Sequence, residues 1–243
     1  MLLVALVCIG GCATAPMRNP LAAWVPSSNH DARRPVLVVL HATEQSGVAE
    51  SLGTLRTRNS GGRVSAHYLI GRDGARYQLV ADGERAWHAG AGRWGTITDV
   101  NSASIGIELD NDGVAPFPEA QIASLLVLLE DLTSRLGIPR TQVIAHADMA
   151  PARKRDPGRL FPWQRLAEAG FGRWPSSVDA PVPDGFDAWL ALAWLGYPLD
   201  DPGAAARAFR RHYRGIDTIH DTLDPDDAVI LHALLRDARA APR

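Results

Sequence analysis

Cysteine is nearly absent from this sequence of 243 residues, with only Cys8 and Cys12, both close to the N-terminus. The rest of the chain therefore cannot form an intramolecular disulfide, a cysteine-rich zinc ribbon or a thiol nucleophile. Any metal ion would have to be held by histidines and carboxylates. An excess of either charge is also lacking, with 25 Lys and Arg against 27 Asp and Glu, which argues against nucleic acid as a partner.

A membrane-spanning run is lacking as well, because the apolar stretch Met1–Thr14 is shorter than the ~20 residues that a span requires. Such a stretch is typical of an export signal. Its end, Ile9-Gly10-Gly11-Cys12, resembles the lipobox of bacterial lipoproteins, although no Lys or Arg precedes the run. The resemblance implies a lipid anchor on Cys12 and a location at the periplasmic face of the bacterial cell envelope, as an outer-membrane lipoprotein.

Composition divides the chain into five segments. Residues 1–12 fit a lipoprotein signal, and the polar residues 13–34 contain three prolines, which is typical of a tether. Residues 35–171 are long enough for one catalytic domain. A second group of prolines indicates a linker at 172–185, and residues 186–243 show three short helical patterns.

Strand and helix patterns alternate within the predicted catalytic domain. Val36–Leu40 is an aliphatic run typical of a buried strand, and Ser104–Leu109 and Gln142–Ala145 predict two more strands. An apolar stripe between Pro118 and Gly137 predicts the longest helix. Further predicted elements are a helix at 46–58, a hairpin of Ala66–Ile70 with Ala75–Val80, an ordered loop at 147–162, and helices at 186–195, 203–213 and 225–239. The expected fold is α/β, a mixed central sheet flanked by helices, with a small C-terminal three-helix module.

Two histidines, His41 and His146, stand where predicted strands end, and Asp156 lies one loop beyond the second. Polar groups at strand ends often form ligand sites in α/β sheets. Two imidazoles and one carboxylate, with the fourth position left to water, would suit a catalytic zinc ion. On the residues alone the alternative stays open, since a strand-end histidine is more often a hydrogen-bonded structural residue and the short H-E-x-x-H signature is absent.

Several blocks of sequence resemble the type 2 N-acetylmuramoyl-L-alanine amidases, a family of zinc-dependent peptidoglycan amidases related to phage amidases and to peptidoglycan recognition proteins. The resemblance covers about Val36 to Trp163. It rests on Leu40-His41-Ala42-Thr43, Ser65-Ala66-His67-Tyr68-Leu69-Ile70, Ala86-Trp87-His88-Ala89-Gly90, Ser104-Ile105-Gly106-Ile107-Glu108, and the stretch from His146 through Asp148, Lys154 and Asp156-Pro157-Gly158 to Phe161-Pro162-Trp163. It implies one zinc ion per chain bound by His41, His146 and Asp156, and hydrolysis of the amide bond between N-acetylmuramic acid and L-alanine.

The resemblance also implies roles for Glu108 and Lys154 beside the metal. Glu108 would act as the base that takes a proton from water and returns it to the leaving nitrogen. Lys154 would place a positive charge where the oxyanion forms. Without the resemblance, Glu108 is equally a solvated strand end and Lys154 part of an exposed basic loop.

A second set of residues matches blocks that border the family's groove and would contact a sugar and a short peptide. Each could instead be packing or turn structure. The set is His67, Trp87, His88 and Asn101. Trp189 and Trp194, in the first C-terminal helix, are expected in its core.

The C-terminal helices look like the small peptidoglycan-binding modules that are often joined to such amidases. If so, residues 180–243 hold the enzyme on the wall polymer and can be deleted with little effect on hydrolysis of a soluble muropeptide. Two rival functions stay open: a module that binds peptidoglycan without cutting it, and a lipoprotein that ties the outer membrane to the wall. The sequence does not distinguish anhydro from ordinary muramic acid as substrate.

Overall fold

The structure, a computed structural model, describes residues 18–32 and 35–240. The signal and lipid-anchor predictions, including Cys12, lie outside these ranges. Within them, none of the helices combines the length and the apolar character that crossing a bilayer demands.

A six-stranded sheet forms the centre of the molecule. Its strands, in spatial order, are β1 (Ala23–Trp24), β7 (Arg76–Gln78), β6 (Tyr68–Ile70), β9 (Ser104–Leu109), β3 (Leu37–Ala42) and β10 (Val143–Ala145). The pairs from β6 to β10 are all parallel, whereas β7 runs antiparallel to β6. Every residue of β3 is buried, as a central parallel strand requires. The predicted mixed sheet is therefore confirmed.

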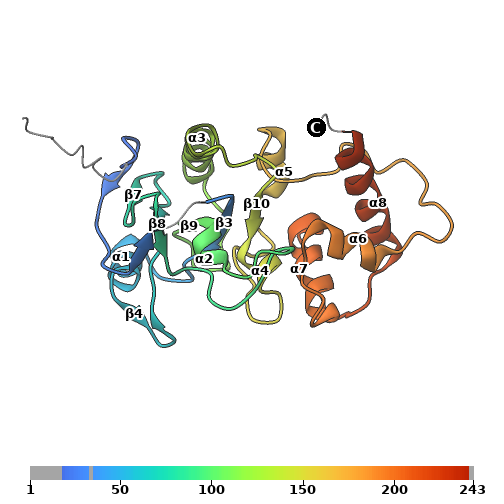
Figure 1. Cartoon of the computed structure of the whole chain (residues 1–243), viewed down its shortest axis with the longest axis horizontal. Helices are drawn as coiled ribbons and strands as arrows, with labels where there is room; N and C mark the ends of the chain where they lie inside the picture. The colour runs from blue at the N-terminus through green and yellow to red at the C-terminus, as the bar shows by residue number, and fades with distance from the viewer. Residues whose placement is uncertain (1–17, 33–34, 241–243) are drawn as a thin grey trace, which may run out of the picture.

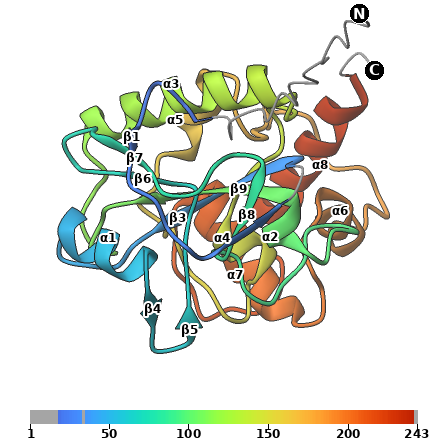
Figure 2. The ribbon, with the colours of Figure 1, turned by 60° about the vertical axis from the view of Figure 1, so that its left-hand side comes forward.

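Helices cover both faces of this sheet (Figure 2). On one face, α3 (Glu119–Leu136) packs in the same buried cluster as Tyr68 and Ile70. On the other, α1 (Val48–Leu55) packs with Leu69, because successive residues of a strand point to opposite faces. α3 ends as predicted, since Gly137 adopts a left-handed φ of 67° that favours glycine.

The N-terminal segment is part of the fold. Strand β1 joins the central sheet, and β2 (His30–Ala32) pairs with β8 (Glu84–Ala86). Asn19 and Ser27 are buried. The prediction that residues 13–34 form a tether is therefore wrong for the described part, 18–32. These strands are too short to show a sequence period, and they pair through backbone groups that composition does not report.

The remaining elements between residues 35 and 171 are short. They are β4 (Arg58–Asn59), β5 (Gly62–Arg63), α2 (Val100–Ala103), α4 (His146–Met149) and α5 (Trp163–Glu168). The expected loop at 147–162 thus contains most of α4, a helix of one turn. No apolar period can develop over four residues, so the sequence pattern did not reveal it.

The three predicted C-terminal helices are present as α6 (Ala188–Leu195), α7 (Pro202–Arg214) and α8 (Pro225–Ala240). They lie at one end of the molecule, beyond β10 and α4 (Figure 1). Their buried residues Leu192, Phe209 and Leu231 belong to the same hydrophobic cluster as the central sheet. Trp194 is 55% exposed, so the expectation that it lies in the helical core is wrong.

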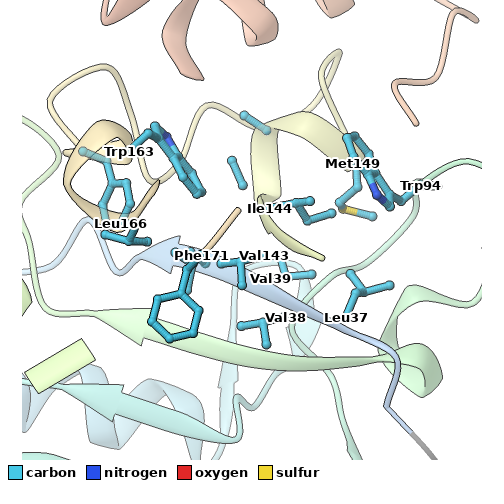
Figure 3. Packing of buried hydrophobic residues seen from close by; sticks show 14 of the residues in the cluster. Leu37, Val38, Val39, Trp94, Val143, Ile144, Met149, Trp163, Leu166 and Phe171 are labelled. Atoms are coloured by element: carbon cyan, nitrogen blue, oxygen red, sulfur yellow. The ribbon is translucent and has the colours of Figure 1, made fainter. Parts of the chain in front are cut away.

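The shared core continues from the sheet towards these helices. Figure 3 shows Val143 and Ile144 of β10 beside β3, with Trp163 on one side and Met149 next to Trp94 on the other. Gly196, which follows α6, approaches the ring of Trp94 so closely that a Cβ there would lie 2.6 Å from it. The C-terminal helices therefore pack directly against the sheet region.

Candidate active site

Three strand ends bring the predicted site residues to one edge of the sheet. His41 lies near the end of β3 and pairs in register with Glu108 on β9. His146 follows β10 directly and begins α4. Because these strands are parallel and adjacent, their carboxyl ends meet at the same edge. The expected juxtaposition of His41, His146 and Glu108 is therefore observed.

The side chains of His41, His146 and Asp156 converge on one point. His41 Nδ1 lies 2.9 Å from His146 Nδ1 and 3.2 Å from Asp156 Oδ2, and His146 Nδ1 lies 3.0 Å from the same oxygen. All three side chains are buried. Two imidazole nitrogens that face each other share at most one proton, so a cation accepting lone pairs from all three groups would satisfy them better. The donor set, two nitrogens and one carboxylate oxygen, fits a zinc ion with a fourth position open.

The other ring nitrogens orient the two imidazoles. His146 Nε2 donates to the backbone oxygen of Ala89 over 2.9 Å, which leaves the lone pair of Nδ1 directed at the convergence point. His41 Nε2 lies 3.0 Å from Nδ1 of His88, whose Nε2 lies 3.2 Å from Ser104 Oγ. Outer hydrogen bonds of this kind fix the tautomer of metal-binding histidines.

Burial sets the charges at this point. Burial and the neighbouring His146 lower the pKa of His41 to about 4, so its imidazole is neutral at pH 7. Burial acts to raise the pKa of Asp156, but the charge and hydrogen bonds of the two imidazoles hold it well below its usual value. A neutral His41 and an ionised Asp156 are in the protonation states that metal binding requires.

Glu108 and Lys154 lie beside this cluster. Burial and the charge of Asp156 raise the pKa of Glu108 to about 8. Its Oε2 is buried, and none of the residues that the structure describes donates a hydrogen bond to it. Lys154 is half-buried and close enough to lower the pKa of Glu108 by its charge. An orphaned carboxylate oxygen next to a cation-binding cluster is poised to exchange a proton with a ligand.

A cavity of about 330 Å³ opens over these residues. Its walls combine the cluster with residues from the loop after β3 and from the β4–β5 hairpin. The lining consists of His41, Ala42, Thr43, Glu44, Gln45, Thr54, Leu55, Asn59, Val64, Ser65, Trp87, His88, Glu108, His146, Lys154 and Asp156. A volume of this size accommodates part of a small ligand.

Of the four predicted substrate contacts, the structure brings Trp87 and His88 to the cavity and not His67 or Asn101. His67 is buried, with Nδ1 accepting from Gly106 N and Nε2 donating to Glu84 O. Asn101 accepts from the backbone of the turn at residues 88–89. Both side chains therefore support the cavity wall without lining it. These positions match the alternative that the sequence left open, namely packing for His67 and turn structure for Asn101.

The cavity wall and the residues packed against it contain groups that the sequence did not single out. Glu44 lines it with a left-handed φ of 52°, a conformation rare for residues other than glycine. The guanidinium of Arg63 stacks 4.7 Å from the ring of Trp87. Gly106 lies under His88, where a Cβ would come within 2.4 Å of the imidazole. Of these three residues, only Gly106 belongs to a sequence block that resembles the amidases, Ser104–Glu108.

Comparison with known proteins places this site in a family. The family model of N-acetylmuramoyl-L-alanine amidase matches residues 31–159. The N-acetylmuramoyl-L-alanine amidase AmiD of Escherichia coli strain K12 is 43% identical over 157 residues, which are 58% of this chain and 55% of that protein. The 1,6-anhydro-N-acetylmuramyl-L-alanine amidase AmpD of Haemophilus influenzae is 41% identical over 104 residues, 42% of this chain and 56% of that protein. The chain thus spans 55% and 56% of the lengths of these relatives, about half.

Two solved structures resemble the whole molecule more fully. The complex of Escherichia coli AmiD with anhydro-N-acetylmuramic acid-L-Ala-D-gamma-Glu-L-Lys superimposes with a TM-score of 0.74 and 35% identity, covering 85% of this chain and 90% of that one. AmpDh3 of Pseudomonas aeruginosa, in complex with an anhydromuramic pentapeptide, gives a TM-score of 0.72 and 29% identity, covering 98% of this chain and 99% of that one. The similarity therefore includes the C-terminal helices.

Proposed function

The chain belongs to the N-acetylmuramoyl-L-alanine amidase family, and from this premise we propose that it hydrolyses the amide bond between N-acetylmuramic acid and the first L-alanine of the stem peptide. The convergence of His41, His146 and Asp156 beside the orphaned oxygen of Glu108 carries the proposal. We propose one zinc ion per chain, held by these three residues. Bound zinc supplies Lewis-acid polarisation of the carbonyl and a water of lowered pKa.

Glu108 moves the proton in this reaction. As water attacks the carbonyl carbon, the carboxylate of Glu108 takes one of its protons, and it delivers that proton to the alanine nitrogen when the C–N bond breaks. Burial raises the pKa of Glu108 above its ordinary value, and a group whose pKa lies near the working pH can accept a proton and then donate it. The muramic acid carboxyl and the free amine of the stem peptide are the products.

Lys154 and the cavity wall bind and orient the substrate. The ammonium of Lys154 lies beside the cluster and stabilises the negative charge that develops on the carbonyl oxygen. Trp87, held in place by Arg63, offers an apolar face against which a sugar ring or peptide can pack. We propose Trp87 and His88 as groove residues, and a structural role for His67 and Asn101.

The rival function is binding of peptidoglycan without cleavage. Digestion of purified muropeptides followed by mass spectrometry separates the two. We expect zinc-loaded protein to release free stem peptides, chelator-treated protein to release none, and added zinc to restore release. Both anhydro and ordinary muramyl peptides belong in the assay, because the ligands of the two solved neighbours are anhydromuramyl peptides. Intact muropeptides after incubation with zinc-loaded protein would leave binding as the function.

We also propose a location in the bacterial cell envelope, with the chain anchored by lipid on Cys12 at the periplasmic face of the outer membrane. The support is the sequence Ile9-Gly10-Gly11-Cys12. A Cys12→Ser variant should then appear in the soluble fraction, whereas the parent protein sediments with membranes. Equal partition of the two proteins would remove the anchor.

A further inference from the structure

The one-turn helix α4 carries more of the site than its length suggests. His146 is its first residue, and the backbone N–H of Ala147 donates to the backbone oxygen of Asp156 over 3.0 Å. Two of the three proposed metal ligands are therefore attached to this single turn. An isolated helix of four residues has no stability of its own, since nucleation of a helix is unfavourable. Something outside α4 has to hold it.

Asp148 is the side chain that holds the turn. It is buried, with 1% of its surface exposed, and its Oδ2 accepts from the backbone N–H of Ala145 over 2.8 Å. This hydrogen bond closes the start of α4 at the residue immediately before His146. The direction in which His146 leaves the sheet therefore depends on where the carboxylate of Asp148 lies.

The C-terminal helices supply the other two donors to this carboxylate. The hydroxyl of Tyr197, just after α6, donates to Asp148 Oδ1 over 2.7 Å. Nδ1 of His212, on α7, donates to Oδ2 over 2.7 Å. A buried carboxylate is costly unless it is hydrogen-bonded, and donors from residues far along the chain meet this need.

The imidazole of His212 is itself fixed by aromatic rings. It stacks on Trp163 of α5 with centroids 3.8 Å apart and 16° between planes, and on Tyr213 with centroids 4.3 Å apart. The ring of His212 therefore lies between Trp163 of α5 and Tyr213 of its own helix. Stacking alone would not require the Nδ1–H of His212 to point at Asp148, so this hydrogen bond indicates a role beyond packing.

We propose that Tyr197 and His212 of the C-terminal region position the metal site, acting through Asp148 and α4 on His146 and Asp156. The C-terminal region then completes the active site from behind, in addition to any contact that it makes with the cell wall. Tyr197 and His212 are positioning residues, because neither lines the cavity over the cluster. This inference rests on the proposed metal site but not on the identity of the substrate.

The test measures metal binding without substrate. Zinc affinity of the full chain is determined by competition with a chromophoric chelator, and the visible spectrum of the Co²⁺-loaded protein reports ligand geometry. We expect His212→Ala to bind Zn²⁺ roughly tenfold more weakly, at the low end of what loss of an outer partner costs, and to show an altered Co²⁺ spectrum. His212→Asn keeps an N–H donor close to the position of Nδ1, so it should recover most of the affinity.

Leu234→Ala is the matched control, because Leu234 is buried in α8 and its apolar side chain cannot donate a hydrogen bond to Asp148. It should lower the stability of the fold while leaving zinc affinity and the Co²⁺ spectrum as in the parent. Should His212→Ala fail to fold, Tyr197→Phe, which removes one oxygen atom, takes its place with the same expectation.

Two results would overturn the inference: parental affinity and spectrum in His212→Ala or in Tyr197→Phe, or an equal loss in Leu234→Ala, which would mean that the helices act on the metal only through global stability. If the parent protein itself bound no zinc, the metal site would fail and this inference with it. Parental zinc binding without release of stem peptide would instead count only against the proposed substrate.

Discussion

Among the residues that the structure describes, two of the buried polar clusters differ in how completely their groups are paired. In the metal cluster, defined by His41, His146 and Asp156, two ring nitrogens face each other at 2.9 Å. In the arginine cluster, Arg210 of α7 is 2% exposed, and its donors reach Asp227 together with the backbone oxygens of the loop before α8. The first cluster has three donor atoms that could bind a metal ion, whereas the second already contains its cation.

This difference separates function from structure. Buried charges that satisfy one another stabilise a particular packing, and they leave nothing to bind a ligand. Buried donor atoms that converge on one point can bind a cation, which offsets the cost of burying them. The two clusters should therefore respond differently to substitution, one through metal content and the other through stability.

The largest effect is expected at the metal cluster. His146→Ala should lose its zinc and lower kcat/KM by about 1,000-fold or more, because a bound metal ion lowers the barrier by several kcal/mol and ~1.4 kcal/mol is tenfold. Metal analysis and muropeptide assays check this. The far-UV circular dichroism should stay unchanged. Retained zinc and activity would show that this histidine is structural, like the members of the arginine cluster.

The second largest effect is expected for Glu108→Gln, which tests proton transfer separately from metal binding. The amide keeps the shape of the side chain but cannot take a proton, so kcat should fall by roughly 10² to 10⁴-fold. Zinc content should equal that of the parent, and KM should change little. A variant with parental kcat would contradict the assignment of Glu108 as the base.

Asp227→Ala should affect stability more than chemistry. It removes the buried carboxylate that pairs with the guanidinium of Arg210 and with a donor of Arg214, and breaking a buried ion pair typically costs about 3 to 5 kcal/mol. Urea unfolding measures the loss, and the protein that remains folded should still bind zinc. A cost below about 1 kcal/mol, as for an exposed pair, would mean that the arginine cluster is not the self-sufficient unit described above.

The smallest effect concerns pH at the edge of the same cluster. Burial acts to raise the pKa of Asp224, but the N–H of Asp227 and the guanidinium of Arg214 hold this pKa below its ordinary value of 3.8. The ionised carboxylate therefore stabilises the fold above pH 3.8, and this contribution is lost as the pH falls through the lowered pKa.

Asp224→Asn tests this sign. Asparagine keeps the capping capacity at the start of α8 and removes only the charge. The variant should be less stable than the parent at neutral pH by under ~1 kcal/mol, since the side chain is partly exposed. The difference should vanish in acid well below pH 3.8. A difference that persists there would come from packing, not from charge.

Much of the catalytic region was predictable because its patterns are long. The aliphatic run of β3 and the apolar stripe of α3 each extend over several residues or turns, and a glycine marks the end of α3. The strand ends then located His41 and His146, while the role of Asp156 came from the resemblance to the amidases. Proximity of these three in space is confirmed.

Other features depend on contacts between distant residues, which no local pattern reports. Strands β1 and β2 were expected in a tether, yet their backbone groups pair with β7 and β8. No sequence pattern singled out His212, because its position beside Asp148 depends on how α7 packs against α4. For the same reason the C-terminal helices are not expected to be removable without loss of hydrolysis.

Anomalous diffraction at the zinc absorption edge, from crystals of the protein grown with zinc, tests the central claim most directly. The account predicts one strong peak per chain, within bonding distance of His41 Nδ1, His146 Nδ1 and an oxygen of Asp156. A map without a peak at that point, or with the ion bound elsewhere, would contradict it.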